Sequence, residues 1–191
     1  MNWCLRKYFF DIFIILIFSP FIFSVLTLVA FFLMLFEGRP IIFKSQRVGV
    51  NQKLFTIYKF RTMVVGAPVI ETDMMDNQST YITKLGRFLR MTSLDELPQI
   101  FNLIIGQMSL VGPRPALQSQ HDLNKSRLDL GISLHKPGIT GLAQIKGRDT
   151  LSLNDKLSYD RLYCCKQSLR YDVSIIISSI IKVLRRSNIS H

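Results

Sequence analysis

Two adjacent carboxylates, Asp95 and Glu96, are the residues whose types and setting first point to chemistry. They stand in the segment Ser93-Leu94-Asp95-Glu96-Leu97-Pro98. Its Ser-x-x-Glu spacing fits a capping box, in which side chains only satisfy backbone N–H groups at the start of a helix. An ionised carboxylate can instead act as a nucleophile or as a metal ligand. The local pattern leaves capping and chemistry equally open.

Pro98 distinguishes two registers for this helix. With Ser93 as N-cap, Pro98 would be the fifth helical residue, where its missing N–H and its ring clash cost about 3 kcal/mol. With Asp95 as N-cap, Pro98 falls at the third position, whose N–H is unpaired anyway. We therefore expect a helix that starts at Asp95 and runs through Gln99 to Ile105. Both carboxylates then lie at its positive end, where the helix dipole favours their ionised forms and attracts phosphate.

Two cationic segments are candidates for binding a phosphate. Arg114 stands between two prolines in Val111-Gly112-Pro113-Arg114-Pro115, so its backbone is rigid and its guanidinium loses little entropy on binding. The alternative is a stiff loop with an exposed arginine. Lys59-Phe60-Arg61 ends an apolar run, and it fits either a phosphate site or a charged strand edge that discourages pairing.

A glycine-rich segment, Lys136 to Arg148, contains three glycines among polar and cationic residues. Glycine lets a backbone approach a ligand closely. The segment has neither the lysine-serine ending of a P-loop nor the GxGxxG spacing, so it does not indicate a nucleotide-binding fold.

Length and charge define the class of protein. The 191 residues are enough for one domain, or one domain plus an anchor, and the net charge of +11 calls for an acidic partner. That partner is nucleic acid, anionic lipid or a phosphorylated substrate. Cys4, Cys164 and Cys165 form no disulfide or metal framework, which favours a reducing, cytosolic setting.

The first 37 residues predict a membrane segment. From Ile12 to Phe36 the chain is apolar apart from a few hydroxyl residues, and it is long enough to cross a hydrocarbon core of roughly 30 Å. A cleaved signal peptide is the first alternative, but the length of this run and the lack of a small-residue cleavage site before Glu37 argue against it.

The topology of this segment follows from a proline and from the flanking charges. Ser19-Pro20 interrupts the first half of the helix. Basic residues stand on both sides of it, and the positive-inside rule draws both ends toward the cytoplasm; they are Arg6, Lys7, Arg39, Lys44 and Arg47. We therefore expect a kinked re-entrant helix, with a plain membrane-spanning anchor as the alternative.

The remaining elements are a hairpin, a loop and two helices. Residues 40–63 predict a β-hairpin, with strands at Ile41-Ile42-Phe43 and at 54–58 and a turn at 49–52, and residues 64–80 read as a loop. From Thr83 we expect an amphipathic helix whose basic face, with Lys84, Arg87 and Arg90, lies on anionic headgroups, with a solvated basic face as the alternative. Val173 to Leu184 predicts an apolar helix too short to span a membrane.

Together these segments resemble the bacterial sugar transferase family, the small monotopic phosphoglycosyl transferases. The matching pieces are Lys59-Phe60-Arg61-Thr62-Met63, residues 92–99, residues 108–115 and residues 137–148, with Asn102 and Asp172 also in place. The match covers nearly the whole chain. The Ser19-Pro20 pair is similar to the break in that family's re-entrant helix.

The resemblance implies a two-step transfer. Asp95 attacks the sugar-linked phosphate of a UDP-sugar and expels UMP, and undecaprenyl phosphate then attacks the aspartyl phosphate. Glu96, together with Asp95, holds Mg²⁺. Further substrate contacts follow from the same resemblance: Arg114 first, then Arg90, Lys59, Arg148, Arg61 and Gln144, with Asp172 orienting one of these cations.

The resemblance also implies an α+β fold, mostly helical. A re-entrant helix at 1–37 would be joined to a catalytic domain at 38–191, which packs at the cytoplasmic face of the bacterial inner membrane and serves surface polysaccharide synthesis. Larger relatives add four membrane helices, so this chain is expected to be the minimal catalytic form. Homo-oligomerisation, the glycan pathway and the sugar itself stay open.

Three departures from the family pattern bear on specificity. Tyr81 stands where an arginine is common, Leu142 where an aromatic is frequent and Lys146 where an asparagine is frequent. The main competing hypothesis is a non-catalytic, membrane-tethered basic module that binds anionic lipid. Nucleic acid is not expected as a partner, because the aromatics lie mostly in the membrane segment and are not interleaved with cations.

Overall fold

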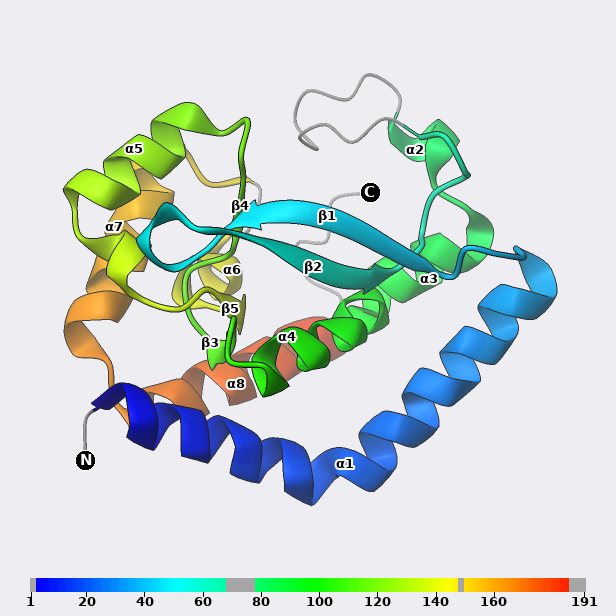
Figure 1. Cartoon of the computed structure of the whole chain (residues 1–191), viewed down its shortest axis with the longest axis horizontal. Helices are drawn as coiled ribbons and strands as arrows, with labels where there is room; N and C mark the ends of the chain where they lie inside the picture. Colours follow the sequence, from blue (N-terminus) through cyan, green and yellow to red (C-terminus); the bar gives the residue numbers. More distant parts are fainter. Residues whose placement is uncertain (1–2, 68–77, 148–149, 186–191) are drawn as a thin grey trace.

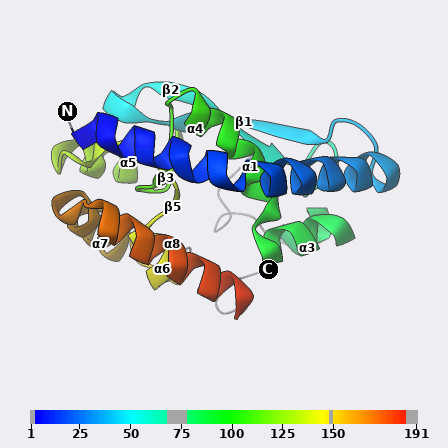
Figure 2. The ribbon, with the colours of Figure 1, turned by 90° about the horizontal axis from the view of Figure 1, so that it is seen from below.

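The computed structural model describes residues 3–67, 78–147 and 150–185, and it is mostly helical with a small sheet. Figure 1 shows the long helix α1 (Trp3–Phe36) along the lower side of the view, with a hairpin above it and the later helices between the two and at both ends of the hairpin. Figure 2, from below, shows α1 crossing the width of the molecule, with the hairpin on one side and the C-terminal helices on the other. The α+β class is confirmed.

Helix α1 is unbroken although Pro20 lies inside it. Proline has no N–H, so the carbonyl of Leu16, four residues earlier, loses its usual helical donor. The hydroxyl of Ser19 takes that place and donates to Leu16 O at 2.8 Å. The ribbon changes direction about midway along α1 (Figure 1). The Ser19-Pro20 pair thus lets the helix continue through a residue that cannot donate.

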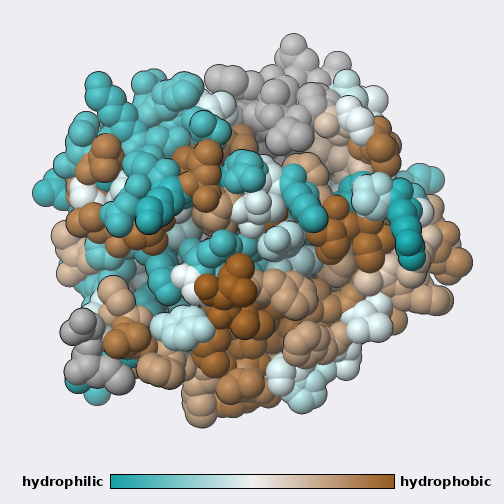
Figure 3. All heavy atoms as spheres, viewed as in Figure 1, coloured by the Kyte–Doolittle hydropathy of each residue, from teal (hydrophilic) through white to brown (hydrophobic). Residues whose placement is uncertain are grey.

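Most of the α1 surface is apolar and exposed. Its buried residues are Lys7, Asp11, Ile15, Val29 and Leu33, while Phe21 and Phe36 are 69% and 70% exposed. Hydrophobic residues gather over the lower half of the view in Figure 3, where α1 lies. Among the described residues, α1 is the one helix that is long enough and apolar enough to cross a membrane.

The predicted hairpin is confirmed, and its strands are longer than expected. Strand β1 (Ile42–Val48) pairs antiparallel with β2 (Leu54–Phe60), joined by a short 3-10 turn, η1 (Val50–Gln52). Strand β4 (Ala116–Leu117) pairs with the other edge of β1. In this register Lys59 opposes Phe43 and Arg47 opposes Phe55, so all four side chains lie on one face of the sheet.

The amphipathic helix expected from Thr83 is α3 (Lys84–Thr92), whose N-cap Thr83 accepts from Gly86 N at 2.9 Å. Lys84 and Arg87 are exposed, whereas Arg90 is turned toward the protein. The loop expected at 64–80 ends earlier than predicted, because α2 (Gln78–Tyr81) is helical, and residues 68–77 lie outside the described residues.

The segment with the two carboxylates is helical, in two parts. A 3-10 helix, η3 (Leu94–Gln99), leads into α4 (Ile100–Ile104). The predicted start at Asp95 is wrong: Ser93 is the N-cap, with φ 57° and without a side-chain cap hydrogen bond. A 3-10 turn accommodates Pro98 because the α-helix begins only after it, so its missing N–H interrupts no α-helical ladder.

The rest of the chain forms a second layer. Strands β3 (Ser109–Val111) and β5 (Gly138–Thr140) pair in parallel. The helices around them are α5 (His121–Asp129), η4 (Ile132–Leu134), α6 (Leu142–Lys146), α7 (Leu153–Lys166) and α8 (Leu169–Leu184), the last containing the apolar helix predicted at 173–184. Val111, Leu142, Tyr163 and Ile175 form a buried cluster in this layer, so Leu142 packs in the core.

Candidate active site

Asp95 and Glu96 lie in the first turn of η3, as the sequence predicted, although the N-cap is Ser93, two residues before the predicted Asp95. Ser93 is the N-cap but its side chain accepts no cap hydrogen bond. The serine half of the Ser-x-x-Glu capping box is therefore not formed.

Glu96 receives two of the predicted cations on one oxygen. Lys59 Nζ donates to Glu96 Oε1 at 2.6 Å, and both terminal nitrogens of Arg114 lie 3.2 Å from the same oxygen. The Lys59 and Glu96 side chains are 15% and 12% exposed, while Arg114 is 43% exposed. Lys59 and Glu96 thus form the inner part of the site, and Arg114 lies at its rim.

Asp95 is buried beside this group, with 8% of its surface exposed. Burial raises the pKa of Asp95 to about 6; Lys59 opposes that rise, Glu96 adds to it, and Arg90 and Arg114 oppose it. At neutral pH the group is ionised, yet its negative charge is less stabilised than in water. Such a carboxylate is a better nucleophile than a fully solvated one.

Arg90 reaches the site from α3. Its Nε donates to Thr62 Oγ1 at 2.9 Å, burial lowers its pKa, and the charge of Asp95 opposes that change. Helix α3 lies close to the backbone of Thr62 because Gly86, which has no side chain, packs against it. A Cβ on Gly86 would be 2.1 Å from Thr62 O.

Asn102 fixes the distance between the carboxylates and the hairpin. Its Nδ2 donates to Thr56 O at 2.6 Å, and its Oδ1 accepts from Tyr58 N at 3.3 Å, so the side chain bonds to the free edge of β2. Asn102 is fully buried. This contact holds η3 and α4 against β2, and so places Lys59 beside Glu96.

The glycine-rich segment supports the Arg114 loop. Gly112 N donates to Thr140 O, and Gly138 N donates to Pro113 O, both at 2.9 Å. A Cβ on Gly138 would lie 2.0 Å from Gly112 N. The sequence predicted a close approach of these glycines to a ligand, whereas the close approach in the structure is between two backbone segments.

Arg47 also belongs to this site, whereas the sequence indicated it only as one of the basic residues that flank the apolar segment. Its side chain shares the inner face of the hairpin with Lys59. Burial and, less strongly, the charge of Arg114 lower its pKa to about 10, against the opposing charge of Glu96. Its buried Nε has no hydrogen-bond partner among the described residues. The strand register could have identified it. Phe43 is the residue opposite Lys59, and Arg47 lies four positions further along β1, on the same face of the strand.

Three other predicted site residues lie in different surroundings. Arg61 donates to the carbonyls of Glu37 and Gly38 at 2.7 and 3.1 Å, where α1 ends. Gln144 is buried and donates to Ile139 O at 2.9 Å. Arg148 lies outside the described residues.

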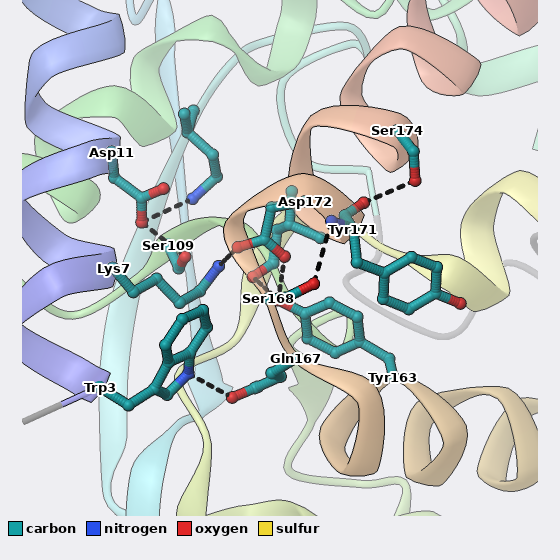
Figure 4. A network of polar contacts seen from close by, with 12 residues as sticks. Trp3, Lys7, Asp11, Ser109, Tyr163, Gln167, Ser168, Tyr171, Asp172 and Ser174 are labelled. Atoms are coloured by element: carbon teal, nitrogen blue, oxygen red, sulfur yellow. Dashed lines mark hydrogen bonds and ion pairs between the residues drawn. The ribbon is translucent and has the colours of Figure 1, made fainter.

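Asp172 belongs to a separate, buried polar network near the start of α1 (Figure 4). It pairs with Lys7 and accepts from the Tyr163 hydroxyl at 2.8 Å, and it is fully buried. In the same region Ser109 Oγ donates to Asp11 at 2.6 Å. The cation that Asp172 orients is thus Lys7, and the network joins α1 to α8, α7 and β3.

Comparison of the chain with known proteins shows its family. The model of the bacterial sugar transferase family matches residues 2–186. The chain is 37% identical over 165 residues to an undecaprenyl-phosphate galactose phosphotransferase from Salmonella typhimurium, which covers 78% of this chain and 34% of that protein. It is 44% identical over 154 residues to a UDP-glucose:undecaprenyl-phosphate glucose-1-phosphate transferase from Klebsiella pneumoniae, which covers 75% and 32%.

A relative of similar length is the exopolysaccharide production protein ExoY of Rhizobium meliloti. It is 34% identical over 181 residues, which is 87% of this chain and 78% of that protein. The chain spans only about a third of the Salmonella and Klebsiella proteins, at 34% and 32% of their lengths. The match to the family model nevertheless covers nearly the whole chain, and this chain belongs to the bacterial sugar transferase family.

Proposed function

We propose that this protein transfers a sugar 1-phosphate from a UDP-sugar to undecaprenyl phosphate, in two steps through a phosphosugar bound covalently to Asp95. The observation that carries the proposal is the buried carboxylate of Asp95 beside Glu96, with the cations of this site directed at the pair. The names of the relatives, which transfer sugar phosphates to undecaprenyl phosphate, support the choice of substrates.

The charge of the cluster favours a phosphorylated substrate. Its cations outnumber its carboxylates: Lys59, Arg90, Arg47 and Arg114 surround Asp95 and Glu96. A partly buried excess of positive charge is stabilised by an anion, and planar guanidinium groups suit phosphate oxygens. A diphosphate that enters here would be neutralised by groups already in place.

In the first step an Asp95 carboxylate oxygen attacks the phosphorus that carries the sugar. The bond from that phosphorus to the bridging oxygen breaks, and UMP leaves with the electron pair. Lys59, Arg47 and Arg114 stabilise the charge that develops on the phosphate oxygens. The product is an acyl phosphate between Asp95 and the sugar.

In the second step a phosphate oxygen of undecaprenyl phosphate attacks the same phosphorus. The bond between phosphorus and Asp95 breaks, which releases undecaprenyl diphosphate sugar and restores the carboxylate. Both steps need an ionised Asp95 at the start or the end, which its pKa of about 6 allows at neutral pH.

The two carboxylates fit a magnesium ion shared with the substrate. Among the described residues no cluster of three or more His, Cys, Asp or Glu side chains could hold a metal alone. Mg²⁺ is commonly held by one or two carboxylates together with substrate phosphates, and Glu96 and Asp95 supply the carboxylates here. When bound, the ion would neutralise charge on the diphosphate.

The same proposal gives α1 a re-entrant topology, with both ends at the cytoplasmic face of the inner membrane. The exposed apolar surface of α1, its Ser19-Pro20 pair and the exposed cations Arg6 and Arg39 support it. A nucleotide sugar in the cytoplasm and a lipid phosphate in the membrane would then both reach Asp95.

Release of UMP tests the function. Purified protein with Mg²⁺, undecaprenyl phosphate and a panel of UDP-sugars should release UMP for at least one sugar, and Asp95→Asn should abolish the release. Incubation with a UDP-sugar labelled in the sugar-linked phosphate, without the lipid, should leave label on the parent and none on Asp95→Asn.

The outcomes separate the candidate functions. No UMP with any sugar, together with binding to anionic vesicles, would favour the non-catalytic lipid-binding module. UMP release by Asp95→Asn at the parent rate would reject the covalent intermediate. Topology has its own test: cysteine tags at both termini should be labelled from the cytoplasm, and a periplasmic N-terminus would reject re-entry.

A further inference from the structure

Arg127, on α5, connects the Arg114 loop to the body of the protein. Its Nη1 donates to the backbone carbonyl of Arg114 at 2.8 Å. The opposite edge of the guanidinium is held by Asp160 on α7, with Nε at 3.1 Å and Nη2 at 2.6 Å from Oδ2. Neither Arg127 nor Asp160 touches Asp95 or Glu96 by any described hydrogen bond.

The Arg114 loop depends on such a contact because two of its residues lack N–H groups. Pro113 and Pro115 donate nothing, so on both sides of Arg114 the backbone contacts that these two residues can make come from their carbonyls. Pro113 O accepts from Gly138 N at 2.9 Å, and Arg114 O accepts from Arg127. The carbonyls on both sides of the Arg114 Cα are therefore held, and with them the direction in which its side chain leaves the backbone.

The shape of arginine matters for this contact. The guanidinium is planar, so fixing Nε and Nη2 against Asp160 also fixes where Nη1 points. The Arg127 and Asp160 side chains are 11% and 2% exposed, so water competes little for either. A lysine has a single nitrogen and cannot hold Asp160 along one edge while aiming a separate donor at Arg114 O.

We propose that Arg127 is a positioning residue for the phosphate contact of Arg114, and that Asp160 aims it. The inference rests on the proposed function, in which Arg114 binds the diphosphate of a UDP-sugar. An ordinary structural link between α5 and α7 would stabilise the fold whether or not Arg114 is present. A positioning residue acts through Arg114, and its effect disappears when Arg114 can no longer make its contact.

A double-mutant cycle distinguishes the two roles. UDP affinity is measured by calorimetry on the full chain in nanodiscs for the parent, Arg127→Lys, Arg114→Lys and the double variant. Arg127→Lys should weaken UDP binding about tenfold, as for loss of one charge-assisted contact. In the Arg114→Lys background the same change should alter the affinity by less than about twofold. Arg161→Lys, an exposed neighbour of Asp160, is the matched control and should bind UDP as the parent does.

Kinetics provide the second readout. With the sugar that gives UMP, Arg127→Lys should raise KM for the UDP-sugar, and Asp160→Asn should change it in the same direction. If Arg127→Lys does not fold, Asp160→Asn replaces it in the cycle. Equal factors in both Arg114 backgrounds, or unchanged UDP affinity, would overturn the inference.

Failure of the inference and of the function can be told apart. A parent protein that binds UDP but releases no UMP disproves the function, and the cycle on UDP affinity still decides the role of Arg127. If the parent binds no UDP, Arg114 makes no phosphate contact and the inference is overturned. The function is then tested separately by UMP release in the same preparation.

Discussion

Lys59 Nζ lies 2.6 Å from Oε1 of Glu96, and this contact joins the end of the hairpin to the first turn of η3. Because Arg114 bonds to the same oxygen, Glu96 gathers cations from two different parts of the chain. The neighbouring Asp95 has no ion pair within 4.0 Å among the described residues, although several charges act on it. The two adjacent acids therefore have different surroundings, which suits different roles.

Glu96→Gln should weaken metal binding more than it disturbs the fold. The amide keeps the shape of the side chain but loses the charge that a magnesium ligand supplies. We expect the Mg²⁺ concentration for half-maximal UMP release to rise at least about tenfold. A Mg²⁺ titration measures this, with Asp129→Asn, on the exposed side of α5, as the control. An unchanged Mg²⁺ dependence would remove Glu96 from the metal site.

Arg47→Gln should weaken substrate binding. The guanidinium lies on the inner face of the hairpin and interacts electrostatically with Arg114 and Glu96. Loss of one charge-assisted phosphate contact corresponds to about a tenfold rise in KM for the UDP-sugar. Lys44→Gln is the matched control, because Lys44 is exposed on the outer face of the same strand. Equal KM values for the two variants would exclude Arg47 from the site.

The pKa of Asp95 predicts how stability changes with pH in metal-free buffer. A pKa raised to about 6 means that the folded state binds this proton more tightly than the unfolded chain, whose value is near 3.8. The contribution of protonated Asp95 is therefore fully present below pH 4 and is lost as pH rises through 6. The loss is up to about 3 kcal/mol.

Asp95→Asn should remove this dependence. Thermal unfolding in EDTA should show the variant to be more stable than the parent above pH 6, with the difference shrinking toward pH 4. Parallel curves for the two proteins between pH 4 and 7 would contradict a raised pKa of Asp95.

Lys7→Met should destabilise the protein strongly. It leaves Asp172 buried without its cation, and breaking one partner of a buried pair typically costs about 3 to 5 kcal/mol. Arg6→Met, which removes an exposed charge next to it, should change the unfolding free energy by less than about 1 kcal/mol. Denaturant unfolding in detergent measures both. A double variant, Lys7→Met with Asp172→Leu, should recover part of the loss.

The helices and strands could be predicted from the sequence where local rules alone determine them. Thr83 caps α3 as its position indicated, and the run before Lys59 forms the second strand of the hairpin. The start of η3 could not be predicted from Pro98, because proline excludes that start only in a continuous α-helix. A 3-10 turn tolerates the proline, and only the tertiary setting decided for it.

The residues of the site could be predicted from the sequence, but the partner that each side chain contacts could not. Asp95, Glu96, Lys59, Arg90 and Arg114 do come together. Asp172 was assigned to the same cations, yet its partner is Lys7, 165 positions away. Such pairings depend on how helices pack, and no local spacing encodes them. Arg47 was missed for a related reason, since only the register of the hairpin turns it inward.

The pairing of Lys7 with Asp172 also orders events during synthesis. Lys7 is synthesised 165 residues before its partner. At about 5 to 20 residues per second, roughly 8 to 33 s separate the two. During that interval Lys7 on α1 has no Asp172 to pair with. The buried position of Lys7 is therefore reached only after α8 has been made, so the packing of α1 against the protein is completed by a helix far later in the chain.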